Sequence, residues 1–125
     1  MNREARSDDA IPADFLPRVA AQFKALSDPM RLAIMNALFH GQRSVGELTT
    51  IVGSSIANVS KHLSVLHHAG WVVRSKAGTT VHYALADRRA AQLCELMCQR
   101  VRERAMKEGE VAPKTAPARR ARRRD

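Results

Sequence analysis

Cysteine and aromatic residues are scarce in this chain of 125 residues. Only 4% of the residues are aromatic, so a core must be built from Leu, Val, Ile, Ala and Met. The length allows one domain with a modest core. Because Cys94 and Cys98 are the only cysteines, the sequence excludes the disulfide framework that stabilises many small secreted domains.

Long hydrophobic runs are also missing. No apolar stretch approaches the ~20 residues that a membrane-spanning helix needs. The N-terminus carries acidic residues and lacks the apolar segment of a secretory signal. We therefore expect a cytoplasmic protein that does not enter a membrane.

The sequence also lacks the usual marks of catalysis. It contains no recognisable pairing of a nucleophile with a base and no glycine-rich phosphate loop, and its acidic residues do not cluster. We predict that the protein is not an enzyme.

Positive charge, in contrast, is plentiful and unevenly distributed. The net charge is +9, and the last fifteen residues hold six basic side chains and one acidic one. We expect residues 1–12 to form a flexible N-terminal segment and residues 109–125 a disordered basic tail. Such a tail strengthens non-specific attraction to nucleic acid, or is simply solvated without a defined partner.

Residues 13–108, between these ends, show helical periodicity followed by strand periodicity. Asp28-Pro29 is typical of a helix start, and Ser44 with Glu47 matches a capping box. The pattern predicts helices with these apolar stripes: Val19, Phe23, Leu26; Met30, Ile34, Leu38; Val45, Leu48, Val52; Ile56, Val59, Leu63, Leu66; and Ala90, Cys94, Met97, Val101, Ala105. Near Trp71 the period changes to two, which indicates a β-hairpin with Gly78 in its turn.

The third and fourth helices are short and are joined by a Gly-Ser turn at Gly53. This is the helix-turn-helix geometry that places a second helix in the major groove of DNA. With the hairpin behind it, the fold class is mainly α with a small β-hairpin. We predict a winged helix-turn-helix with about five helices and a two-stranded wing, and a module for protein contacts is the alternative use of such a fold.

Several segments, in this order and spacing, resemble the ArsR/SmtB family of bacterial repressors. The resemblance covers roughly residues 18–105 and is carried by Leu26-Ser-Asp-Pro-Met-Arg-Leu-Ala-Ile-Met, Ser44-Val-Gly-Glu-Leu, Val59-Ser-Lys-His-Leu-Ser-Val-Leu, Ala69-Gly-Trp-Val and Val81-His-Tyr-Ala-Leu-Ala-Asp. It implies a homodimer formed by the first and last helices, bound to an imperfect inverted repeat in double-stranded DNA. It also implies repression relieved by an inducer, in the bacterial cytoplasm at the nucleoid.

Candidate DNA contacts cluster at the start and outer face of the fourth helix. Ser54 and Ser55 can donate to a phosphate at the helix N-terminus. Asn58 can pair with adenine, and Lys61 can reach guanine or phosphate. The resemblance adds Ser60 and His62, although a packing role for His62 carries equal weight. Arg74, Lys76 and Thr79 on the hairpin are candidates for backbone or minor-groove contacts, or are merely exposed.

Ile56 departs from the family, which often has a polar residue at this position. The periodicity of the helix predicts that Ile56 packs inward. The alternative is an apolar contact with a thymine methyl group.

The resemblance also implies known metal-sensor sites against which the chain can be checked. The third helix has no cysteine for a thiolate site. In the last helix Asp87 is present, but Arg89, Arg100 and Glu103 stand near the places where imidazoles are wanted. We therefore expect that this zinc site is absent.

Cys94 and Cys98 remain, one turn apart on the last helix. Thiolates at this spacing can bind a soft ion together with further ligands, and the candidates are As(III) or Sb(III), Cu(I), Zn and Cd. A thiol-redox or persulfide response is a second interpretation. A third is that both cysteines only pack, since free cysteine is among the most buried residue types.

Overall fold

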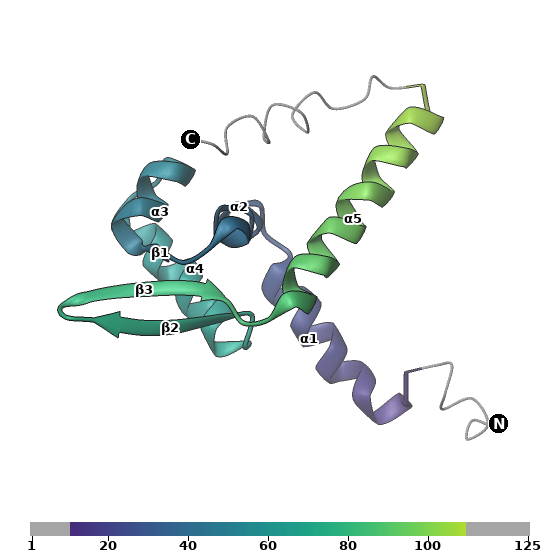
Figure 1. Cartoon of the computed structure of the whole chain (residues 1–125). Coiled ribbons are helices and arrows are strands. Elements are labelled where there is room, and N and C mark those ends of the chain that lie inside the picture. The colour runs from purple at the N-terminus through teal and green to yellow at the C-terminus, as the bar shows by residue number, and fades with distance from the viewer. Residues whose placement is uncertain (1–10, 110–125) are drawn as a thin grey trace. The chain divides into compact units, whose positions relative to one another are not determined.

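The computed structural model describes residues 11–109 (Figure 1). These residues belong to two compact units that divide between Ala90 and Ala91. The elements, in chain order, are η2 (Ala13–Phe15), α1 (Leu16–Leu26), α2 (Pro29–Ala37), η3 (Leu38–His40), β1 (Arg43–Ser44), α3 (Val45–Val52), α4 (Ile56–His68), β2 (Val72–Ala77), β3 (Thr80–Leu85) and α5 (Arg88–Lys107). The five α-helices and the hairpin confirm the predicted fold class. Nearly all of the two predicted terminal segments lies outside the described residues.

Local capping signals fix the helix starts. The Asp28 carboxylate accepts from the backbone N–H groups of Met30 at 2.9 Å and Arg31 at 3.1 Å, with Pro29 at the first helical position of α2. In α3 the capping box is complete, since Ser44 Oγ accepts from Glu47 N and the Glu47 carboxylate accepts from Ser44 N. These caps satisfy backbone N–H groups that a helix start leaves without partners.

The turn between α3 and α4 is tight. Gly53 adopts a left-handed conformation with φ +66° and ψ +48°, and it ends α3. Two residues later Ser55 caps the start of α4, its hydroxyl accepting from Asn58 N at 3.1 Å. The predicted helix-turn-helix is therefore present, with the turn chemistry that the sequence indicates.

The core of the first unit lies among α2, α3, α4 and the start of β2. Its largest fully buried side chains are Ile34, Met35, Leu38, Leu48, Val59, Leu63, Leu66 and Val72. Burial of such side chains contributes roughly 1.5–3 kcal/mol each relative to exposure. This core holds the buried face of α4 and leaves the opposite face of the helix open to solvent.

The sheet is antiparallel with the strand order β1-β3-β2 (Figure 1). β2 and β3 pair from Val72 with Leu85 to Ala77 with Thr80. Gly78, in the two-residue connection, has φ +66°. β1 adds a third strand that the sequence did not predict, because two residues are too few to show an alternating pattern. Since Ser44 ends β1 and caps α3, this strand ties the helix-turn-helix to the hairpin.

α5 begins next to Asp87, whose carboxylate accepts from Arg89 N at 2.9 Å. In the second unit this helix exposes a series of large apolar side chains, namely Leu96, Met97, Val101 and Met106. Across residues 11–109, no helix combines the length and apolar character needed to cross a membrane.

Candidate nucleic-acid interface

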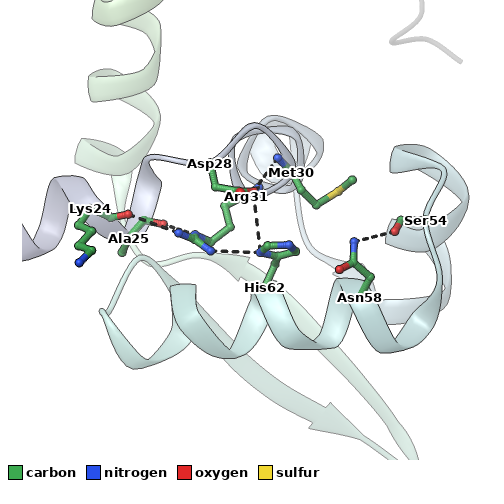
Figure 2. Close-up of polar contacts among 8 residues, drawn as sticks. All are labelled: Lys24, Ala25, Asp28, Met30, Arg31, Ser54, Asn58 and His62. Carbon is green, nitrogen blue, oxygen red and sulfur yellow. Dashed lines mark hydrogen bonds and ion pairs between the residues drawn. The ribbon is translucent and has the colours of Figure 1, made fainter.

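Three of the predicted contact residues form a hydrogen-bonded cluster where α4 begins. Ser55 Oγ accepts from the backbone N–H of Asn58. Asn58 Nδ2 donates to Ser54 Oγ at 2.9 Å (Figure 2). Ser55 is exposed, whereas Ser54 and Asn58 are half-buried. The Asn58 amide therefore braces the turn with one N–H and keeps its oxygen and second N–H for another partner.

The outer face of α4 carries Ser60, Lys61 and Ser64, all of them exposed. Val59 and Leu63, on the opposite side, are fully buried. Lys61 is the basic residue in this face and projects an ammonium group from the middle of the helix. The arrangement suits a helix that rests its outer face against an anionic surface.

His62 differs from its two neighbours. Only 9% of His62 is exposed. The Nδ1 atom of its ring lies 3.2 Å from Arg31 Nη1 and 3.9 Å from Asp28 Oδ2 (Figure 2). The position three residues after Val59 and four before Leu66 puts it on the buried arc. Of the two roles that the sequence leaves open for His62, this burial favours packing over a DNA contact.

Ile56 is 63% exposed, so the prediction that it packs inward is wrong. It is the first residue of α4 and lies at the edge of the packed surface, where helical periodicity no longer decides burial. This side chain is available for contact with a partner beside the start of α4.

The wing, defined as the β2–β3 hairpin at residues 72–85, carries the remaining predicted contacts. Arg74 and Lys76 are exposed and share one face of β2, because alternate residues of a strand point to the same side. Thr79 is exposed in the connection. The wing therefore presents two cations and a hydroxyl that are separate from those of α4.

Sequence reasoning missed Arg31, although it lies in a segment that carries the family resemblance. Its guanidinium contacts the end of α1 and the His62 ring on α4 (Figure 2). Helical periodicity gives no signal for it, because Arg31 is neither on the apolar stripe of α2 nor fully exposed.

The two cysteines lie in the second unit and have different surroundings. Cys94 is half-buried, and this burial raises the pKa of its thiol. Cys98 is exposed, and its sulfur accepts from Arg102 Nη2 at 3.4 Å. Among residues 11–109 no group of three or more His, Cys, Asp or Glu side chains is arranged to hold a metal ion. The two thiols suit a soft ion, but further ligands must come from elsewhere.

A helix-turn-helix whose second helix exposes a polar outer face, followed by a cationic β-hairpin, defines a winged helix-turn-helix DNA-binding protein. The sequence model of the family described as "Bacterial regulatory protein, arsR family" matches residues 28–73. The chain belongs to this ArsR family. Membership confirms the resemblance found in the sequence and identifies a transcriptional regulator, not an enzyme.

Individual relatives agree with this assignment. The HTH-type transcriptional regulator NmtR of Mycobacterium tuberculosis is 35% identical over 94 residues, which cover 74% of this chain and 78% of NmtR. The cadmium resistance transcriptional regulatory protein CadC of Listeria innocua is 37% identical over 81 residues, covering 64% and 68%. The homodimeric winged helix-turn-helix domain of Mb0332 from Mycobacterium bovis, described as a possible ArsR-family regulator, superposes with a TM-score of 0.68 at 31% identity, covering 77% of this chain and 88% of that one.

Proposed function

We propose that this chain is a homodimeric repressor that binds an inverted-repeat operator and leaves it when an inducer binds. The observation that carries the proposal is the division of α4 into a buried face and an exposed face with Ser60 and Lys61. A two-fold dimer presents two such helices, and therefore recognises two related half-sites.

Within this proposal each contact has a separate role. Asn58 and Lys61 read bases, with Ser60 beside them, while Ser54 and Ser55 hold a phosphate at the start of α4. On the wing, Arg74, Lys76 and Thr79 contact the DNA backbone or the minor groove. His62 is left out because its ring is buried.

The proposed dimer is formed by α1 and α5. Both helices expose large apolar side chains, including Leu16 and Phe23 on α1 and Leu96 and Val101 on α5, and Phe15 is exposed directly before α1. Clusters of apolar residues on a soluble protein commonly mark contact surfaces. The likeness to Mb0332, which is described as homodimeric, adds support.

The proposed inducer is a soft metal or metalloid bound by the thiolates of Cys94 and Cys98. Relatives such as CadC are named for cadmium resistance, and soft ions prefer thiolate ligands. Since no third ligand accompanies these thiols among residues 11–109, the site as proposed takes its remaining ligands from the second subunit. A thiol-redox response is the alternative, favoured by the exposure of Cys98.

DNA binding is tested with a duplex that spans the region upstream of the gene encoding this chain. Fluorescence anisotropy at several salt concentrations compares the wild type with Lys61→Ala, Lys76→Ala and the exposed control His67→Ala. We expect weaker binding and a lower salt dependence for the two lysine variants, by about one unit of slope each. If Lys76→Ala leaves affinity and slope unchanged, the wing does not contact the DNA. If neither lysine matters, the proposed interface is wrong.

Induction is tested on the same duplex with the variant Cys94→Ser/Cys98→Ser. Arsenite, Zn²⁺, Cd²⁺, Cu(I) and peroxide are added to separate samples, and release of the DNA is measured. We expect one of them to release the wild type and not the double variant, so that the effective reagent distinguishes metal sensing from redox sensing. Equal release of both proteins would mean that the cysteines only pack.

A further inference from the structure

Arg31 joins three helices through a single guanidinium group (Figure 2). Nε donates to the carbonyl oxygen of Ala25 at 2.6 Å, and Nη2 donates to that of Lys24 at 3.4 Å. Both carbonyls belong to the last turn of α1, where a cation is favourable, and Lys24 O also accepts from Ser27 N at 3.1 Å. The remaining nitrogen, Nη1, lies 3.2 Å from Nδ1 of His62 on α4.

The chemistry of this last contact determines the state of the His62 ring. A guanidinium group only donates hydrogen bonds, so Nδ1 must be the acceptor. In this tautomer the ring proton is on Nε2. Asp28 Oδ2 is 3.9 Å from Nδ1, which is longer than a hydrogen bond, and it already accepts two backbone N–H groups.

The contact between Arg31 and His62 gives α4 a directional interaction, which its apolar face does not provide. Val59, Leu63 and Leu66 hold the helix against the core, and apolar packing is non-directional. The planar guanidinium fork, in contrast, donates in fixed directions. Because its other donors bind the end of α1, the position of the His62 ring is set relative to that helix.

We propose that Arg31 and His62 are positioning residues that fix the rotation of α4 about its own axis. Lys61 precedes His62 directly, and successive helical residues lie ~100° apart around the axis. A shift of the His62 ring therefore turns the outer face of α4. The inference rests on the proposed function, since rotation matters only if that face reads DNA.

The test separates loss of the hydrogen bond from loss of packing. Leu at position 62 fills space but accepts no hydrogen bond, whereas Asn places an amide oxygen near the position of Nδ1. We expect His62→Leu to bind the upstream duplex about tenfold more weakly, equivalent to ~1.4 kcal/mol, and His62→Asn to restore most of the affinity. Equal weakening by both variants would refute a role for the hydrogen bond.

A second variant guards against a folding defect. Arg31→Lys keeps the charge but cannot reach Ala25, Lys24 and His62 together, so it should also weaken DNA binding. Urea unfolding shows whether each variant is folded under the binding conditions. A long-range ¹H–¹⁵N spectrum of the imidazole should report the Nε2–H tautomer in the wild type and a mixture of tautomers in Arg31→Lys, a change that simple packing does not predict.

Two further variants distinguish this inference from the proposed function. His67→Leu introduces the same replacement at an exposed position of α4 and should bind like the wild type. Lys61→Ala tests the outer face directly. If Lys61→Ala weakens binding while His62→Leu and Arg31→Lys do not, the positioning role is wrong and the DNA interface stands. If the upstream duplex does not bind the wild type at all, the proposed function fails, and the inference fails with it.

Discussion

Two glycines of the α3 region should respond in opposite ways to the same substitution by alanine. Gly46 lies in the first turn of α3, where an added Cβ would be 3.9 Å from Ser44 Oγ, an ordinary contact. Gly53 follows the helix with φ +66°, and an added Cβ there would meet no atom within 4 Å. Because neither site is crowded, the two substitutions differ in the backbone conformation that alanine must adopt.

The expected free energies follow from that difference. At Gly46, alanine suits the helix and reduces the freedom of the unfolded chain, so stability should rise by about 0.5–1 kcal/mol. At Gly53, the left-handed conformation costs an L-residue about 1–2 kcal/mol, and the same unfolded-state gain offsets part of it. We expect a net loss of about 1 kcal/mol for Gly53→Ala and a smaller loss for Gly53→Asn, since Asn tolerates this conformation.

Urea unfolding followed by circular dichroism measures both changes. All variants are compared at one protein concentration, because self-association makes apparent stability concentration-dependent. The midpoint should rise for Gly46→Ala and fall for Gly53→Ala, with unchanged slopes. If both alanine variants shift the midpoint in the same direction, the left-handed turn is not the source of the difference, and the account of the helix-turn-helix turn is wrong.

The other predictions concern the core, pH and the thiols. Leu63→Ala should lower the free energy of unfolding by roughly 2–5 kcal/mol in the same assay, because this side chain is fully buried. The backbone N–H of Arg31 lowers the pKa of Asp28, so this carboxylate stabilises the fold above its unfolded pKa and loses that effect as the pH falls. Between pH ~5 and ~3 the wild type should therefore lose more stability than Asp28→Asn, and parallel curves would contradict this. Since burial raises the pKa of Cys94, iodoacetamide at neutral pH should modify Cys98 first, as peptide mass spectrometry can show.

The features predicted well from the sequence are those decided within a few residues. Asp28-Pro29, the Ser44 capping box and Gly53 act through their own backbone neighbours, and the structure has each of them where the pattern places it. The core positions of α4 followed as well, because helical period alone separates buried Val59 from exposed Lys61.

The features that the sequence did not predict depend on contacts with distant segments of the chain or on where the core ends. β1 exists because Arg43 and Ser44 meet Tyr83 and His82, far along the chain. The environment of His62 likewise depends on Arg31, which no local pattern pairs with it.

At Ile56 the error has a different origin. A prediction of burial from helical periodicity holds only where the core extends along the whole helix. The core does not extend to the first residue of α4, so Ile56 is exposed. The residues of α4 that face a partner are therefore set partly by where the core stops.

In the proposed complex with DNA, the residues that distinguish one base sequence from another differ in part from those that add affinity. Lys61 is the only lysine or arginine in this helix, and an ammonium is a compact charge that gains most from phosphate and guanine contacts. Ile56 is 63% exposed and uncharged, but it can distinguish thymine from the other bases by an apolar contact with the thymine methyl group. Sequence reading would then come from Ile56, Asn58 and Lys61, while the wing adds salt-sensitive affinity. In this division the rotation of α4 matters more than the number of its polar side chains, because an apolar contact with one methyl group tolerates little displacement.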